Sequence, residues 1–194
     1  MKKILYLGPE TQLISFLREG GYEVHLEQDR LTLEDFSNIS PDLVVSYGYR
    51  YIIKEDIINE YDIINLHISY LPWNRGADPN FWSIYDETVR GVTIHFIDSG
   101  IDTGDIIFQK EVKFGDNERS LSTSYTRLKN EIEKLFIESW SKIESGQYER
   151  IPQNTNEGSH NYKKRLGKMW HLLPNRWKTT REEIKCLKKE LTLK

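Results

Sequence analysis

The sequence predicts an α/β protein with a Rossmann-like, doubly wound, mostly parallel sheet and a short C-terminal extension. Two observations carry this prediction. Short apolar runs alternate with segments of helical periodicity through the first half of the chain, which is the pattern of β-α-β units. The run Leu43–Val45 is also continuously apolar, as expected of a strand covered on both faces. In such a fold, ligands bind at the carboxyl ends of the strands.

The N-terminal elements follow this alternation. A first strand is expected at Ile4–Leu7, and a helix at Glu10–Glu19 ends where Gly20-Gly21 follows. The turn between them, Gly8–Glu10, contains neither a G-x-G-x-x-G nor a Walker-type sequence. A dinucleotide or nucleoside triphosphate bound there in the usual way is therefore not expected. Further strands are expected at Tyr22–Leu26, Asp42–Tyr47 and Asp62–His67, with a helix at Lys54–Tyr61.

The second half begins with an expected helix at Asp78–Glu87, followed by an alternating strand at Val92–Ile97. A loop, Asp98–Gly104, precedes a strand at Asp105–Phe114. A long amphipathic helix is expected at Ser120–Glu144, with Ser120 as its N-cap. Residues 150–194 are less regular, so we expect a main domain at residues 1–149 and a basic extension at residues 150–194.

Length, apolar content and charge limit the kinds of protein that this chain can be. The chain has 194 residues and 38% apolar content, enough for one globular domain, and its net charge is −3. Residues 163–194 hold eleven Lys or Arg against three acidic residues, a local charge of +8. This segment is either a solvated extension or a basic surface that meets a phosphate, RNA or an acidic partner subunit. By itself it does not indicate a nucleic-acid-binding protein.

Targeting and cysteine content point to the cytoplasm. The single cysteine, Cys186, excludes an internal disulfide and a cysteine-based zinc site, as is usual in a reducing compartment. The short apolar run Ile4–Leu7 is broken by Gly8-Pro9, so neither a signal peptide nor a membrane span is expected. We expect a cytoplasmic protein that does not bind a membrane.

Three polar residues suggest a catalytic site. Asn65 and His67 lie two residues apart at the end of a predicted strand and therefore point to the same side of the sheet. Asp102 lies in the loop before the last predicted strand. Taken singly, Asn65 fits an ordinary strand-end turn and His67 a satisfied polar residue. His95, in the middle of a strand, is either a hydrogen-bonded core residue or a residue that orders the site. No metal-ligand set is evident, so no metal is expected.

Three motifs occur in order along the chain, namely Asn65-x-His67, Leu71-Pro72-x-x-Arg75-Gly76 and Asp102-Thr103-Gly104. Their order and spacing resemble the folate-dependent formyltransferase family, over roughly residues 42–112. This resemblance implies transfer of a formyl group from N10-formyltetrahydrofolate to an amine, through a tetrahedral intermediate with a developing oxyanion. Asn65 and His67 would donate hydrogen bonds to the oxyanion, and Asp102 would favour a charged His67 and accept the proton of the amine.

The resemblance also implies a folate site in two loops. The pterin would lie against the segment Ser46–Ile52 and against backbone groups of the Asp98–Gly104 loop. A surface turn packed by its own tyrosines is the alternative for the first of these segments. The cofactor-binding residues expected from the resemblance are Tyr49, Arg50, Tyr51, Ile52, Asp98 and Gly100.

The acceptor expected from the resemblance is a nucleotide-linked amino-deoxysugar. Residues 65–80 are most similar to the sugar N-formyltransferases, which favours dTDP-4-amino-4,6-dideoxyglucose and a role in O-antigen or other surface-glycan (lipopolysaccharide) synthesis. Arg75 would pair with a pyrophosphate oxygen, and aromatic side chains would cover the deoxysugar. Sugar enzymes of this group also suggest a homodimer. The substrate-binding residues expected are Ser69, Tyr70, Trp73, Arg75 and Trp82.

Other functions remain open. Phosphoribosylglycinamide formyltransferase of purine synthesis is the main alternative, because enzymes of that kind resemble this chain in size. Methionyl-tRNA formyltransferases carry a further C-terminal domain, for which 194 residues leave no room. Alternatives of another class are a non-catalytic folate- or nucleotide-binding protein and a scaffold in a glycan-synthesis complex.

Overall fold

The computed structural model describes residues 1–154 and 156–192, and the chain forms two compact units. Two strands and the longest helix each contribute residues to both units, and the domain boundary expected at residue 149 remains a prediction. Unit 1 consists of Met1–His67, Ile94–Phe108 and Glu133–Pro152, and unit 2 of Ile68–Thr93, Gln109–Ile132 and Gln153–Lys194.

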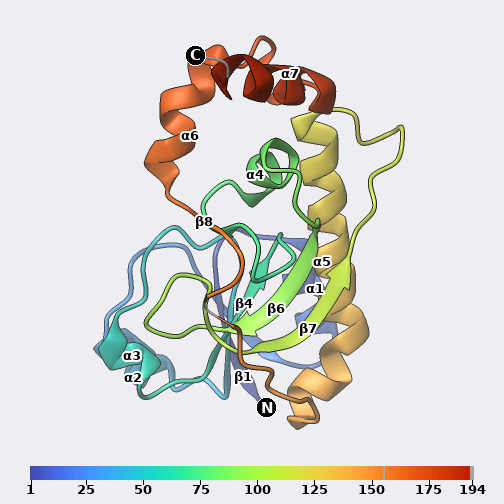
Figure 1. The fold of residues 1–194 in the computed structure, drawn as a ribbon. Coiled ribbons are helices and arrows are strands. Elements are labelled where there is room, and N and C mark those ends of the chain that lie inside the picture. The colour runs from blue at the N-terminus through green and yellow to red at the C-terminus, as the bar shows by residue number, and fades with distance from the viewer. Residues whose placement is uncertain (155, 193–194) are drawn as a thin grey trace. The chain divides into compact units, whose positions relative to one another are not determined.

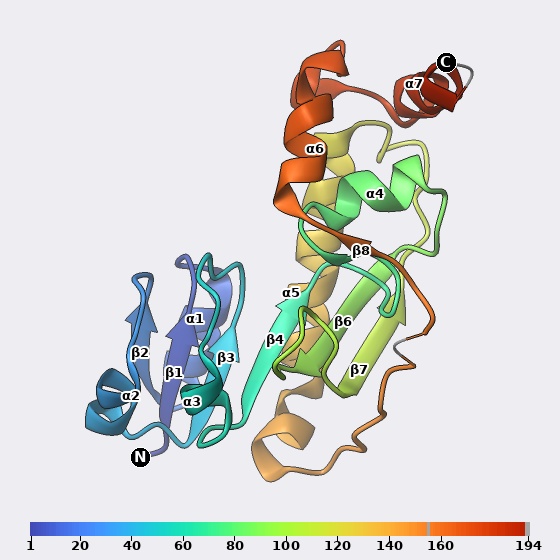
Figure 2. The same cartoon turned by 60° about the vertical axis from the view of Figure 1, so that its left-hand side comes forward.

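The sheet confirms the predicted α/β class (Figure 1). The first four strands pair in parallel in the order β2-β1-β3-β4, and Figure 2 shows them side by side. Because β1 lies between β2 and β3, the chain extends the sheet in both directions, which is the doubly wound arrangement. The strands are β1 Lys3–Leu7, β2 Glu23–Glu27, β3 Leu43–Ser46, β4 Ile63–His67, β6 Gly91–Phe96 and β7 Ile106–Glu111.

Side chains of the unit 1 strands alternate between two apolar layers. Leu5 and Leu7 pack with Phe36 of α2 (Leu33–Ile39) and with Ile57 of α3 (Glu55–Ile58). Tyr6 points the opposite way, because successive strand residues alternate, and its hydroxyl bonds Thr11 at the start of α1 (Gln12–Glu19) at 2.8 Å. The two layers cover the sheet on both faces, as the continuous apolar runs predict.

Helix α2 was not predicted from the sequence, although its start signal is present. Thr32 and Asp35 form a capping box, in which each side chain accepts a hydrogen bond from the other's backbone N–H. The spacing Thr-x-x-Asp therefore marks the helix in the sequence. Only Phe36 is buried in this helix, so its apolar periodicity is too weak to stand out.

The long helix α5 (Leu121–Ser145) agrees with the prediction within one residue at each end. Ser120 caps it, because its hydroxyl accepts the N–H of Thr123 at 3.3 Å while the Thr123 hydroxyl accepts the N–H of Ser120 at 3.1 Å. One face of the helix is buried, as expected of an amphipathic helix, and its buried apolar residues are Leu121, Leu128, Ile132, Phe136, Trp140 and Ile143. No helix among the described residues is apolar over enough of its length to cross a membrane.

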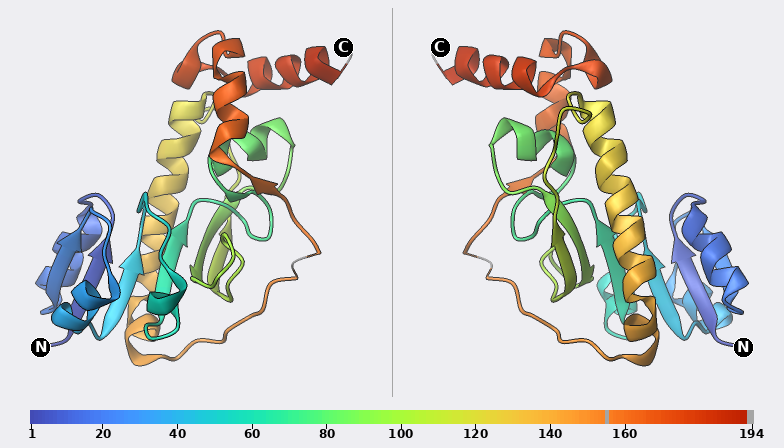
Figure 3. Two further views of the ribbon diagram at one scale, coloured as in Figure 1. Left: turned by 90° about the vertical axis from the view of Figure 1, so that its left-hand side faces the viewer. Right: turned by 90° about the vertical axis from the view of Figure 1, so that its right-hand side faces the viewer.

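Unit 2 contains most of the residues expected to be irregular. Helices α4 (Pro79–Tyr85) and α6 (Lys163–Met169) lie beside the first half of α5, and α7 (Arg181–Thr192) lies beside α4 (Figure 3). A short strand pair, β5 (Arg75–Gly76) with β8 (His160–Asn161), joins the C-terminal segment to the unit. The shared core consists of Phe81, Trp82, Ile84, Leu121, Leu166, Leu173 and Ile184.

Candidate active site

Strand β4 carries two polar residues of the candidate site, Asn65 and His67. Ile63 packs in the apolar layer under α2 and α3. Because strand side chains repeat every two residues, Asn65 and His67 continue on the same face as Ile63. The neighbouring strand β6 is held in register by a hydrogen bond from the Ile97 N–H to the Ile63 carbonyl at 2.8 Å. Ile97 packs against the same layer, so His95 points to that face next to Asn65.

Asp102 reaches these residues from the loop after β6. Its Oδ1 accepts a hydrogen bond from Asn65 Nδ2 at 3.3 Å, and its Oδ2 lies 3.6 Å from His67 Nδ1. Its Oδ1 also lies 3.5 Å from His95 Nε2. All four residues belong to unit 1. The structure thus brings together the three residues proposed as catalytic from the sequence and adds His95 to them.

His95 is a positioning residue in this cluster. Its Nδ1 donates a hydrogen bond to the Phe96 carbonyl at 2.7 Å, so in the neutral ring Nε2 carries the lone pair. That lone pair accepts a hydrogen bond from Asn65 Nδ2 at 3.2 Å. The two N–H groups of the Asn65 amide are therefore directed to His95 and Asp102. His95 is almost fully buried, and this contact favours the site-ordering role over the simple core role.

The loop that presents Asp102 is held by its own groups. Asp98 Oδ1 accepts hydrogen bonds from the Gly100 N–H at 3.1 Å and from the Thr103 hydroxyl at 2.7 Å. Asp102 itself has a left-handed backbone, with φ of 53°, a conformation that Asp and Asn tolerate better than most residues. The Asp98 carboxylate thus shapes the turn, and the folate contact expected from Asp98 and Gly100 remains a prediction.

Replacing Gly104 by alanine is expected to disturb this loop. An added Cβ would lie 2.0 Å from the Phe96 carbonyl oxygen, so the backbone beside Asp102 must move, at a cost of about 1–3 kcal/mol. We expect a lower melting temperature together with a lower kcat. Gly167→Ala is the matched control, because nothing lies within 4 Å of its added Cβ in α6 and alanine favours a helix. Equal melting temperatures and equal kcat values for the two variants would contradict this prediction.

The segment Tyr49–Ile52 combines an anchored end and an exposed end. The Tyr49 hydroxyl donates to the Asp29 carbonyl at 2.6 Å and accepts the Leu31 N–H at 3.3 Å, and burial raises the pKa of this phenol. Tyr51 packs edge-on against Tyr49. The segment is therefore packed by its own tyrosines, yet Arg50, Tyr51 and Ile52 keep exposed surface, and their folate contact remains a prediction.

The structure contradicts the role predicted for Trp82. Its side chain has no exposed surface and lies in the unit 2 core, with the Arg165 guanidinium 4.1 Å above the ring. A residue buried in this way offers no surface to a sugar. Trp73 and Tyr70 retain exposed surface, while the buried Ser69 donates to the Trp73 carbonyl at 2.5 Å.

Arg75 holds the C-terminal segment of unit 2. Its Nε donates to Gln153 Oε1 at 3.1 Å, and its Nη1 and Nη2 donate to the carbonyls of Glu157 and Asn154 at 3.2 and 3.3 Å. Its backbone N–H also donates to the Ser159 carbonyl next to β8. The buried guanidinium is thus bound to the protein itself, which argues against the predicted pairing with a pyrophosphate.

Arg75→Met is therefore expected to reduce stability by about 3 kcal/mol, because hydrogen bonds from a charged donor contribute about 1.5–3 kcal/mol each. Urea denaturation measures this loss. Arg127→Met serves as the control, since the half-exposed Arg127 pairs with Glu131 on one helix, an interaction worth about 0.5 kcal/mol. Unchanged stability with a raised substrate KM would instead return Arg75 to the substrate site.

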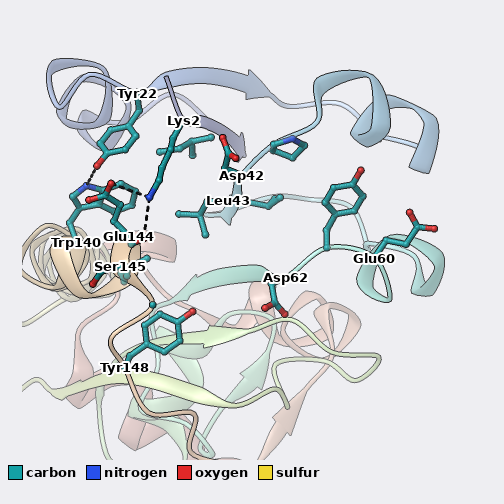
Figure 4. A pocket seen from close by; sticks show the side chains of 16 residues that line it. Lys2, Tyr22, Asp42, Leu43, Glu60, Asp62, Trp140, Glu144, Ser145 and Tyr148 are labelled. Atoms are coloured by element: carbon teal, nitrogen blue, oxygen red, sulfur yellow. Dashed lines mark hydrogen bonds and ion pairs between the residues drawn. The ribbon is translucent and has the colours of Figure 1, made fainter.

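A hollow of about 590 Å³ in unit 1 lies at the other edge of the sheet. Its lining includes residues at the amino ends of strands, such as Lys2, Leu43 and Asp62 (Figure 4). Lys2 pairs with Glu144 at 3.2 Å, and Asp62 pairs with Arg150 at 2.9 Å. Since ligands of this fold class bind at the carboxyl ends of strands, this hollow is not the candidate active site. No cluster of metal-ligating side chains occurs within the described part of the chain.

A family model described as formyl transferase matches residues 8–139 of the chain. The solved structure of the formyltransferase PseJ from Anoxybacillus kamchatkensis, in complex with UDP-4,6-dideoxy-4-formamido-L-AltNAc and tetrahydrofolate, is 46% identical. The match covers 94% of this chain and 97% of that chain, with a TM-score of 0.88. A 4-N formyltransferase from Francisella tularensis shares the fold, at 24% identity and a TM-score of 0.76, over 87% of this chain and 79% of its own.

The curated relatives are longer proteins. Methionyl-tRNA formyltransferase from Alkaliphilus oremlandii is 31% identical over 142 residues, which are 72% of this chain and 46% of that protein. The chain therefore spans about half the length of the curated relatives it matches.

Proposed function

Because this chain belongs to the formyl transferase family, we propose that it transfers a formyl group from N10-formyltetrahydrofolate to the amine of a nucleotide-linked amino-deoxysugar. The observation that carries the proposal is the cluster formed by Asn65 and His67 of β4, His95 of β6 and Asp102 of the loop after β6. It combines hydrogen-bond donors on Asn65 and His67 with one carboxylate, which is what acyl transfer to an amine requires.

The proposed reaction proceeds through a tetrahedral intermediate. The amine nitrogen attacks the formyl carbon, and the carbonyl electrons move onto oxygen. Asn65 Nδ2 and the His67 ring donate hydrogen bonds to this oxyanion. Asp102, directly or through a water molecule, takes the proton that the amine loses. When the oxyanion collapses, the bond to N10 of the folate breaks and N10 receives the proton that Asp102 took from the amine, so that the formylated amino sugar and tetrahydrofolate are the products.

The sugar group is proposed from the relative that covers nearly the whole chain. PseJ binds a UDP-linked 4-formamido-4,6-dideoxy sugar, which supports a 4-amino-4,6-dideoxy sugar as the acceptor here. The sequence analysis favours a dTDP-linked glucose derivative, whereas the PseJ complex favours a UDP-linked sugar, and we place the UDP sugar first because of the 46% identity. A role in surface-glycan synthesis and a homodimeric assembly remain part of the proposal.

Methionyl-tRNA is the second candidate acceptor, because the curated relatives are methionyl-tRNA formyltransferases. Those relatives extend well beyond the segment that this chain matches. Glycinamide ribonucleotide is retained as a third acceptor. The candidates differ in the molecule that carries the amine, whereas the formyl donor is the same.

Mass spectrometry of products separates these candidates. The purified protein is incubated with N10-formyltetrahydrofolate and, in separate reactions, with UDP- and dTDP-linked 4-amino-4,6-dideoxy sugars, glycinamide ribonucleotide or methionyl-tRNA. We expect a nucleotide sugar to gain the mass of one formyl group. Formylation of methionyl-tRNA or glycinamide ribonucleotide alone would overturn the sugar proposal. Folate binding without any product would favour the non-catalytic alternative.

A further inference from the structure

Two arginines in unit 2 flank one aromatic ring. Arg90 precedes β6, Phe114 follows β7, and Arg181 is the first residue of α7. The guanidinium carbons of Arg90 and Arg181 lie 5.3 and 5.9 Å from the centre of the Phe114 ring. Arg181 Nη2 also donates to the Gly115 carbonyl at 3.0 Å. The ring therefore attracts both side chains, and the Gly115 carbonyl also holds Arg181.

The positive charge of this pair is not neutralised nearby. Neither arginine forms an ion pair with any residue that the structure describes. The Nε atoms of both are buried and lack a hydrogen-bond partner among the described residues. Burial, followed by repulsion from Arg181, lowers the pKa of Arg90, and Glu87 opposes that change. Two partly desolvated cations held side by side are costly, and an anion between them would remove that cost.

The basic surface continues along α7. Ile184 and Leu187 pack against the core shared with α4, and Lys185 and Lys189 beside them are exposed. A groove beside them is lined by Glu87, Lys185, Lys188, Lys189 and Thr192. Glu87 is the only acidic residue of this lining, and it pairs with Lys185 at 2.7 Å. The groove and the arginine pair together therefore carry a clear excess of positive charge.

We propose that Arg90 and Arg181, clamped on Phe114, form a binding site for the phosphoryl group of a phosphate-bearing ligand, with the lysines of α7 attracting it. Planar guanidinium groups bind phosphate oxygens in a bidentate manner, and two such groups suit a phosphate or diphosphate better than a single carboxylate. This gives the basic C-terminal segment a specific ligand chemistry. It does not depend on the identity of the formyl acceptor.

Calorimetric titration of the whole protein with inorganic pyrophosphate tests the site. We expect saturable binding that weakens as salt increases, and a loss of affinity of about tenfold or more in Arg90→Gln/Arg181→Gln. Arg181→Lys keeps the charge but not the planar fork, so it is expected to bind with intermediate affinity. The control is Lys164→Gln/Lys178→Gln, which removes the same charge from exposed positions in the same unit and should bind like the wild type.

Two further arms identify the source of the phosphoryl group. Co-sedimentation with phosphatidylcholine vesicles, with and without phosphatidylglycerol, tests a lipid headgroup, and the KM for a nucleotide sugar tests a soluble diphosphate. The site is supported if the arginine variants bind vesicles less or have a raised KM for the nucleotide sugar, while the lysine control behaves like the wild type. The proposal is overturned if pyrophosphate does not bind, or if the arginine and lysine variants lose affinity equally while circular dichroism shows both to be folded.

Discussion

Replacing Asp102 by asparagine is expected to lower kcat by about 10²–10⁴-fold, the contribution typical of a positioned acid–base group. Asparagine keeps the size of the side chain and one oxygen that can accept the Asn65 hydrogen bond at 3.3 Å. It also tolerates the left-handed backbone at this position, where φ is 53°. The substitution therefore removes the negative charge beside His67 and the acceptor of the amine proton while changing little else.

Binding should separate this loss from a structural defect. Because the charge acts near the transition state, dissociation constants for tetrahydrofolate and for the nucleotide sugar are expected to change by only a few-fold. Asp105→Asn is the control, since it removes a carboxylate from the end of the same loop and no contact of its side chain with the cluster is described. Near-normal turnover in Asp102→Asn would remove Asp102 from the mechanism.

The order of the first four strands in unit 1 was predictable because their signals are local. Ile4–Leu7 and Leu43–Val45 are continuous apolar runs, and β1 and β3 form there. The C-terminal segment lacks such signals, because α6 and α7 are rich in lysine and arginine and bury few residues of their own. They are held by distant residues such as Phe81 and Leu121, which pack against Leu166 and Ile184 in one core. Contacts of that kind cannot be read from periodicity.

The site was predictable to the extent that it follows from strand geometry. The period of two along β4 places Asn65 and His67 on one face, and the family resemblance adds Asp102. The contact between His95 and Asn65 depends on the register of β6 beside β4, which a single sequence does not specify. Trp82 was predicted to contact the substrate because it is aromatic and lies shortly after the Leu71-Pro72-x-x-Arg75-Gly76 motif. The same apolar character buries it in the core instead.

Asn65→Ala is expected to lower kcat by about 10²–10³-fold, the usual effect of removing one oxyanion donor. Asn65 Nδ2 bonds His95 and Asp102 at 3.2 and 3.3 Å, and these lengths exceed the usual 2.9–3.0 Å. The amide can therefore turn one N–H toward a developing oxyanion at small cost. Asn59→Ala, at the exposed end of α3, is the control and should keep normal turnover.

The double variant Asn65→Ala/Asp102→Asn decides whether the two residues act as one unit. Asn65 and Asp102 are in direct contact, so their effects on kcat should not add, and the double variant should be little slower than the worse single variant. Additive losses would mean that each side chain contributes independently, with Asn65 acting on the oxyanion and Asp102 elsewhere. A melting temperature lowered in Asn65→Ala with kcat unchanged would assign Asn65 to structure alone, because the amide would then only satisfy His95 and Asp102.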